Sequence, residues 1–282
     1  METMTTNYPS LTPEEKWEQA TLANNFIFYK VMRNHQDACK QLLEMLLGIK
    51  IESMEMKQEE TIALDYDSKG IRLDVFVKDT GRMFDVELQV ANTKELPERA
   101  RYYQGVMDVD TLKAGQKYKE LRDSHIIFIY LEDVFKNGLP VNTFANICLE
   151  DKKTKFGDRT YKHFFFAPLC AKMIEDKEVK AFFEFLISNQ ASSSYTDELK
   201  NYVADAKQST ENKMQFMTWE RQRAYDLDAG REEGIAIGAQ QKAVEAAENM
   251  MKKNYPVDDI CEITGLSLEQ VLEIKEKITV KM

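Results

Sequence analysis

The sequence predicts an α/β protein in which helices cover a mixed β-sheet, and three observations lead to this fold class. Residues 71–78 and 83–91 alternate apolar and polar side chains with the period of two that is typical of strands. Residues 124–131 form a continuous apolar run between polar residues, which is typical of a buried central strand. A long helical pattern at 97–121 lies between these strands, and this order of elements is typical of α/β or α+β domains.

Two helices are expected before the first strand. Thr12 and Glu15 have the spacing of a capping box, with a proline at the first helical position, so a helix is predicted to start there and to run to about residue 33. A second helix is predicted at 35–47, where leucines form a stripe and Gly48 ends the pattern.

Three shorter segments complete the predicted sheet. Residues 49–56 show the alternation of a strand, and 142–149 and 159–167 are further strand candidates. Everything after residue 175 has a helical pattern.

The last third of the chain has a different composition. Residues 210–254 are charged and rich in alanine, and Gly230, Gly234 and Gly238 recur at four-residue spacing. Such a stripe lets a second helix approach closely, so we interpret it as a self-association or packing feature, with a flexible junction as the alternative. Residues 256–277 have the outline of a helix-turn-helix, but their acidic side chains favour contact with a protein over the reading of DNA.

These changes in composition predict the domain organisation. We expect an α/β domain at 12–190, a long helical segment at 191–254 and a helical hairpin at 255–282. Residues from about 210 onward are expected to be dispensable for the core fold and to contact another copy or a partner.

Charge and composition limit the classes of function. The 282 residues carry a net charge of −10, which counts against a simple DNA-binding module. A metal-dependent nuclease remains compatible, because bound divalent cations supply positive charge where a phosphate lies. No signal-peptide pattern or membrane-spanning apolar segment is recognisable, and the four cysteines lack the spacing of a metal site or a disulfide framework. A cytoplasmic protein is therefore expected.

The two alternating segments predict a β-hairpin with paired carboxylates. If its turn centres between Thr80 and Gly81, Asp74 lies opposite Glu87, and a loop of two or four residues gives the same pairing. Opposed like charges destabilise a sheet, but carboxylates about 5 Å apart are tolerated when a divalent cation lies between them. A loop of three or five residues would break the pairing and leave an ordinary hairpin with a solvated polar face.

Period-two alternation divides the hairpin into two faces. One face is apolar and is expected to pack under a helix: Leu73, Val75, Val77, Phe84, Val86, Leu88 and Val90. The other face carries most of the polar residues and is the expected metal face: Arg72, Asp74, Phe76, Asp85, Glu87 and Gln89.

The hairpin resembles the active-site hairpin of the PD-(D/E)XK nuclease-like transposases, also called recombination-promoting nucleases. The resemblance is carried by 73–75, with Asp74 at its centre, and by 86–89, which contains Glu87 and Gln89. In that family the last motif position is typically Gln, whereas other PD-(D/E)XK enzymes have Lys.

Further motifs extend the resemblance over residues of about 20 to 170, in the same order and spacing. Residues 24–30 resemble the N-terminal Asn-Asp-Phe-x-Phe-Lys-Lys signature, and 126–130 fall where the family has its buried strand. Residues 99–103 and 115–118 resemble its Arg-x-x-Tyr-Tyr and Gly-x-x-Tyr helix motifs. The resemblance implies a restriction-endonuclease-like core with a helical C-terminal extension.

The same resemblance implies the roles of the site residues. Asp74 and Glu87 are expected to ligate Mg²⁺ or Mn²⁺, with the Leu88 carbonyl as a further oxygen ligand, and the metal would activate a bound water. Gln89 carries no charge and is expected to orient the attacking water or a phosphate oxygen.

Other polar residues have two interpretations each. Arg99 and Tyr103 are four residues apart on a helix and either bind a phosphate and a base or pack against the sheet. Asp85 is interpreted as peripheral, and Glu44 as an outer carboxylate of the site or a solvated side chain. The three histidines are interpreted as structural.

The predicted function is metal-dependent DNA endonuclease activity, linked to transposition or recombination, with DNA as partner and a homo-oligomer formed through the C-terminal helices. The alternative is a catalytically silent binding or assembly protein that keeps the nuclease fold. Two departures from the family signature bear on this choice, because Asn25 replaces the usual Asp and Tyr29 the usual Lys.

Overall fold

The structure is a computed structural model that describes residues 11–56, 61–62, 71–72, 75–79, 81–89 and 95–279. The chain divides into two compact units, Met1–Phe216 and Met217–Met282. No helix among the described residues is long and apolar enough to cross a membrane.

A mixed sheet forms the centre of the first unit. Its six strands within the described residues are arranged in the order β1-β4-β5-β6-β8-β7. The three strands β5, β6 and β8 pair in parallel, whereas the remaining pairs are antiparallel. The strands are β1 (Glu55–Met56), β4 (Val75–Lys78), β5 (Arg82–Gln89), β6 (Asp123–Tyr130), β7 (Val141–Phe144) and β8 (Thr160–Phe166), and β2 (Thr61–Ile62) and β3 (Ile71–Arg72) form a separate antiparallel pair.

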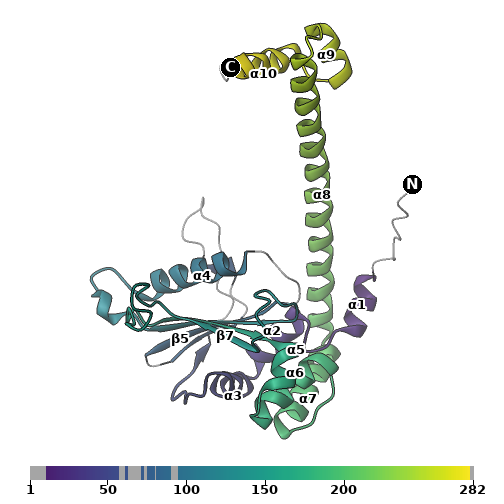
Figure 1. Ribbon diagram of the computed structural model, residues 1–282. Helices are drawn as coiled ribbons and strands as arrows, with labels where there is room; N and C mark the ends of the chain where they lie inside the picture. The colour runs from purple at the N-terminus through teal and green to yellow at the C-terminus, as the bar shows by residue number, and fades with distance from the viewer. Residues whose placement is uncertain are drawn as a thin grey trace. The chain divides into compact units, whose positions relative to one another are not determined.

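Helices flank the sheet on both sides, which confirms the predicted fold class. Figure 1 shows α4 on one side of the sheet and α3, α6 and α7 on the other. The helices are α1 (Pro13–Gln19), α2 (Asn25–Asn34), α3 (Gln36–Leu47), α4 (Leu96–Thr111), α5 (Ala167–Met173), α6 (Lys177–Ser188), α7 (Ser194–Gln208), α8 (Thr210–Lys252), α9 (Val257–Thr264) and α10 (Leu268–Thr279).

The N-terminal helix starts where the sequence predicts and ends earlier. The Glu15 amide donates to Thr12 Oγ1 at 3.2 Å and the Thr12 amide to Glu15 Oε2 at 2.8 Å, which confirms the capping box. The prediction of one helix as far as residue 33 is wrong, because Ala20 is extended and Asn24 caps a second helix. Asn24 Oδ1 accepts the amides of Phe26 at 3.0 Å and Ile27 at 3.3 Å.

Helix α4 is also shorter than the predicted 97–121. It ends at Thr111, where Leu112 becomes extended. Gly115 then has φ of 88°, a left-handed conformation that ends helical structure, and only Tyr118–Glu120 form a 3-10 turn. The Gly-x-x-Tyr motif therefore lies in the connection between α4 and β6, with Tyr118 at the start of the 3-10 turn, and not on α4.

Two predicted strands are shorter because their backbone groups are bonded elsewhere. The prediction of a strand at 49–56 holds only for Glu55–Met56, since Glu44 accepts the Ile51 amide at 2.8 Å and Asp79 accepts the Ser53 amide at 3.2 Å. The prediction at 142–149 holds only as far as Phe144, after which the chain forms a loop.

The register of the hairpin agrees with the sequence prediction wherever it is described. Val75 pairs with Val86, Phe76 with Asp85 and Lys78 with Met83. The Asp79 amide donates to the Arg82 carbonyl at 2.9 Å, as expected for a loop of two residues. Asp74, the predicted partner of Glu87, lies outside the described residues.

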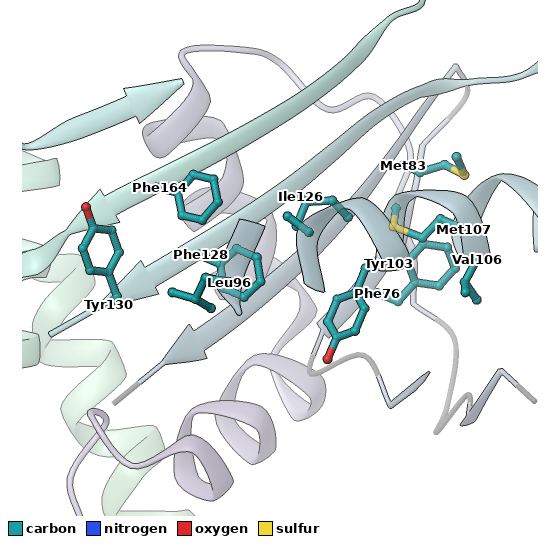
Figure 2. Close-up of a cluster of buried hydrophobic side chains, with 11 residues drawn as sticks. Phe76, Met83, Leu96, Tyr103, Val106, Met107, Ile126, Phe128, Tyr130 and Phe164 are labelled. Carbon is teal, nitrogen blue, oxygen red and sulfur yellow. The ribbon is translucent and has the colours of Figure 1, made fainter. Parts of the chain in front are cut away.

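Both faces of the hairpin are buried, although only one was expected under a helix. Figure 2 shows the apolar cluster between α4 and the sheet, in which Phe76 and Met83 of the hairpin meet Tyr103 and Met107 of the helix. Phe76 belongs to the predicted metal face, so that face lies beneath α4. The residues of the predicted apolar face that are described are buried too: Val75, Val77, Phe84, Val86 and Leu88.

The second unit contains most of α8 together with α9 and α10. Gly265, with φ of 72°, ends α9 in a left-handed turn, and the helical hairpin predicted at 256–277 is confirmed. An apolar cluster joins the hairpin to the end of α8: Ala247, Ile260, Leu266, Val271 and Ile274.

Candidate active site

Glu87 is a buried carboxylate near the end of β5. It is 3% exposed and pairs in the sheet with Phe128 of β6. Its Oε2 receives a hydrogen bond from Arg99 Nη2 at 2.9 Å, and the two side chains form an ion pair. Burying a carboxylate without a cation costs free energy, and the ion pair with Arg99 offsets part of that cost.

Arg99 lies in the first half of α4 and is held from several sides. Its Nη2 also donates to the Tyr103 hydroxyl at 3.0 Å, because residues four apart share a helix face. The guanidinium lies over the rings of Tyr103, at 5.3 Å, and Phe128, at 5.6 Å. With 27% of its side chain exposed, Arg99 connects the buried carboxylate to the surface.

Tyr103 takes part in both the core and the site. Its ring is one of the cluster between α4 and the sheet. Burial, and next the negative charge of Glu87, raise the pKa of the Tyr103 hydroxyl to about 12. The hydroxyl therefore stays protonated at neutral pH and accepts the bond from Arg99.

Asp85 is a second buried carboxylate on β5. It is fully buried, and its interpretation as peripheral to the metal site stays a prediction. It precedes Glu87 by two positions and so points to the same face of β5. Its charge contributes to the raised pKa of Tyr103, which places it in the same electrostatic environment as Glu87 and Arg99.

The remaining predicted site residues have different positions. Leu88 is buried on the opposite face of β5, and the backbone of Gln89 pairs with Tyr130, while the Gln89 side chain lies outside what is described. Glu44 accepts the Ile51 amide and lies 3.7 Å from Lys50 Nζ, so it stabilises the start of the following segment. Asn25 is the half-buried first residue of α2.

The residues that the sequence predicts to hold a metal are only partly described. No group of three or more His, Cys, Asp or Glu side chains gathers in the described part of the chain. The donor set at this face is nevertheless of the right chemistry, because Asp85 and Glu87 supply the carboxylate oxygens that Mg²⁺ and Mn²⁺ prefer. Asp74, the further ligand predicted from the sequence, is outside the described residues.

A pair of histidines was missed by the sequence analysis. His125 Nδ1 lies 3.1 Å from His163 Nε2, and His163 Nδ1 lies 3.1 Å from Thr143 Oγ1. Burial lowers the pKa of both imidazoles to about 4. No local spacing indicates this pair, since it depends on the parallel register of β6 and β8.

One comparison identifies the family of the chain. A family model described as PD-(D/E)XK nuclease family transposase matches residues 24–226, from α2 into the first part of α8. No curated protein and no solved structure matches the chain. The match covers most of the sequence, including the hairpin with Glu87 and the helix with Arg99, and the chain therefore belongs to the PD-(D/E)XK nuclease family transposases.

Proposed function

We propose that this protein is a metal-dependent DNA endonuclease, linked to transposition or recombination. Membership of the PD-(D/E)XK family supports a nuclease- or transposase-type function. The observation that carries the proposal is the position of Glu87, a buried carboxylate that forms an ion pair with Arg99 and lies on the motif strand with Asp85 on the same face.

The residues have the following proposed roles. Asp74 and Glu87 hold a divalent metal, Mg²⁺ or Mn²⁺, together with the Leu88 carbonyl, and Gln89 orients the attacking water or a phosphate oxygen. When bound, the metal supplies a water of lowered pKa and positive charge for the scissile phosphate. Arg99 and Tyr103 bind substrate near the surface end of the site, where Arg99 is part-exposed.

The second candidate function is a silent nuclease fold that binds or assembles with a partner. Two observations favour it. Arg99 supplies a counter-charge to Glu87 from within the chain, and Asn25 supplies no charge at a position where the family usually has Asp. Both candidate functions share the fold, so only the chemistry distinguishes them.

The test is cleavage of plasmid DNA by the purified chain with Mg²⁺ or Mn²⁺. We expect nicking or cleavage that chelation stops and that Asp74→Ala and Glu87→Ala each abolish, because each removes a metal ligand. Gln89→Ala should reduce the rate less, since a water-orienting hydrogen bond contributes less than a metal ligand.

Glu98→Ala is the matched control, because Glu98 is an exposed carboxylate on α4. Its activity should equal that of the wild type. Cleavage that persists in the chelator, or full activity of Glu87→Ala, would contradict the endonuclease proposal.

We also propose that α8 associates with a second copy of the chain. Leu227 is 65% and Ile237 50% exposed, and Gly230 and Gly234 lie between them on the same face. A Cβ at either glycine would meet no atom within 4 Å, so packing within the chain does not require glycine there. Glycine inside a helix costs about 1 kcal/mol relative to alanine, and a closely approaching partner helix would offset that cost.

A further inference from the structure

The ion pair of Glu87 and Arg99 involves the carboxylate that the proposed function assigns to the metal. Arg99 Nη2 lies 2.9 Å from Glu87 Oε2, and only 4% of the Glu87 side chain is exposed. Charges in such a buried position interact strongly, because little water screens them. A divalent ion at Glu87 would therefore be repelled by the guanidinium and would compete with it for the same oxygens.

Arg99 does not leave this position easily. Besides Glu87, its guanidinium contacts the Tyr103 hydroxyl and the faces of two rings, Tyr103 and Phe128. A planar cation held by a carboxylate, a hydroxyl and aromatic faces is well ordered, and a lysine would reproduce its charge but not these contacts.

We propose that Arg99 is a positioning residue that holds Glu87 in the metal-free protein and sets the affinity of the site for a divalent ion. This inference rests on the proposed function. A metal held by Glu87 would weaken or displace the ion pair, so Arg99 lowers the affinity of the site below the value that the carboxylates alone would give. The contacts of Arg99 with Glu87, Tyr103 and Phe128 thereby determine the concentration of metal needed to fill the site.

The experiment is calorimetric titration of the full chain with Mn²⁺, combined with thermal melting in a chelator. Arg99→Gln should bind Mn²⁺ about tenfold more tightly or better, because the competing charge is gone. The same variant should melt at a lower temperature without metal, because Glu87 has lost its cation. Tyr103→Phe, which removes only the hydroxyl that accepts from Arg99, should bind Mn²⁺ a few times more tightly, by roughly two- to fivefold.

Two further variants separate charge from packing. Arg99→Lys should melt lower than the wild type yet bind Mn²⁺ about as weakly, since it keeps the charge and loses the stacking. Arg101→Gln removes an exposed arginine of the same helix and should change neither quantity. A gain in affinity for Arg99→Gln that disappears when Asp74→Asn is added would place the ion in the proposed site.

The outcomes distinguish the two proposals. If the wild type and Arg101→Gln bind Mn²⁺, and Arg99→Gln and Tyr103→Phe bind it no more tightly, the role of Arg99 is refuted while the metal site stands. If neither the wild type nor any variant binds Mn²⁺, the proposed metal-dependent function itself is refuted.

Discussion

His125 and His163 show how strongly the sheet controls the chemistry of single residues. The two imidazoles bond to each other across parallel strands, and His125 also stacks between the rings of Phe84 and Tyr161. Because both pKa values lie near 4, both imidazoles are neutral at physiological pH. Burial is the main reason that protonation of either imidazole is disfavoured, because the charged form loses its hydration there.

Acid should therefore destabilise the protein through this pair. Burial lowers the pKa of each histidine from 6.5 to about 4, so between these values the unfolded chain binds more protons than the folded one. The contribution to stability is complete above about pH 6.5 and is lost as the pH falls towards 4. When the pH is lowered from about 7 to about 5, the free energy of unfolding should fall in both proteins. The fall should be about 1–2 kcal/mol smaller for His163→Gln than for the wild type.

Urea unfolding at a series of pH values measures this difference. The NMR titration of the imidazole protons provides an independent check of the two pKa values. An identical pH dependence for the wild type and His163→Gln would contradict the prediction.

At the residue scale the sequence predicts part of this arrangement and not the rest. The role of Glu87 stays a prediction from its motif position, whereas helical spacing places Arg99 and Tyr103 on one face, as the structure shows. The contact of Arg99 with Glu87 was not predicted, because it depends on how α4 lies over β5. The full burial of Asp85 has the same cause.

At the scale of elements, α2 depends on a cap that the sequence analysis placed inside a helix. Asn24 accepts two backbone amides of the first turn of α2. Asn24→Ala should lower the free energy of unfolding by about 1 kcal/mol, because two amide donors lose their acceptor. Chemical denaturation measures the change, and Asn34→Ala, at the exposed last position of the same helix, is the control. Equal stability of the two variants would show that the cap contributes nothing.

Elements with a strong local signal were predicted well. The turn centred between Thr80 and Gly81 gave the register of β4 and β5, and the apolar run at 124–131 gave β6 within a residue at each end. The ends of helices and strands were predicted poorly where the backbone amides bond to side chains or form turns instead of continuing the helix or the sheet. The break after α1, the early end of α4 and the short β1 and β7 all belong to this kind, because caps and turns outside the periodic pattern decide them.

At the scale of the whole molecule, the start of α8 belongs to the core. Phe216 is fully buried, with its ring 5.2 Å from that of Trp17 and 5.5 Å from that of Phe26. Lys30 Nζ also donates to Gln215 Oε1 at 2.6 Å. The expectation that residues from about 210 onward are dispensable for the core is therefore wrong for the first two turns of this helix.

Two truncations test this division of the chain. A protein ending at residue 226, where the family match ends, should melt cooperatively, whereas one ending at 208 should be destabilised by about 3–5 kcal/mol or fail to fold, because it lacks Phe216. Thermal melting measures the difference, and Tyr225→Ala, at a 64% exposed position, is a control that should keep the stability of the full chain.

The same truncations address self-association. If α8 joins two copies, the full chain should be a dimer by light scattering. The protein ending at 226 should then be a monomer, so its particle mass should fall by more than the mass of the removed tail. Gly234→Ala should stabilise the helix by about 1 kcal/mol and weaken association at the same time. If the protein ending at 226 and Gly234→Ala each contain the same number of chains per particle as the full-length wild type, the proposal for α8 is refuted.

The parallel pairing of β6 with strands before and after it in the chain has a consequence for synthesis. During translation β6 emerges after β5 and α4 and can pair with β5, but its other edge remains open until β8 has emerged. In that interval the edge of a strand built of isoleucine, phenylalanine and tyrosine is a template for pairing between nascent chains. The time needed to translate residues 131–166 therefore sets how long each new molecule is exposed to aggregation or requires a chaperone.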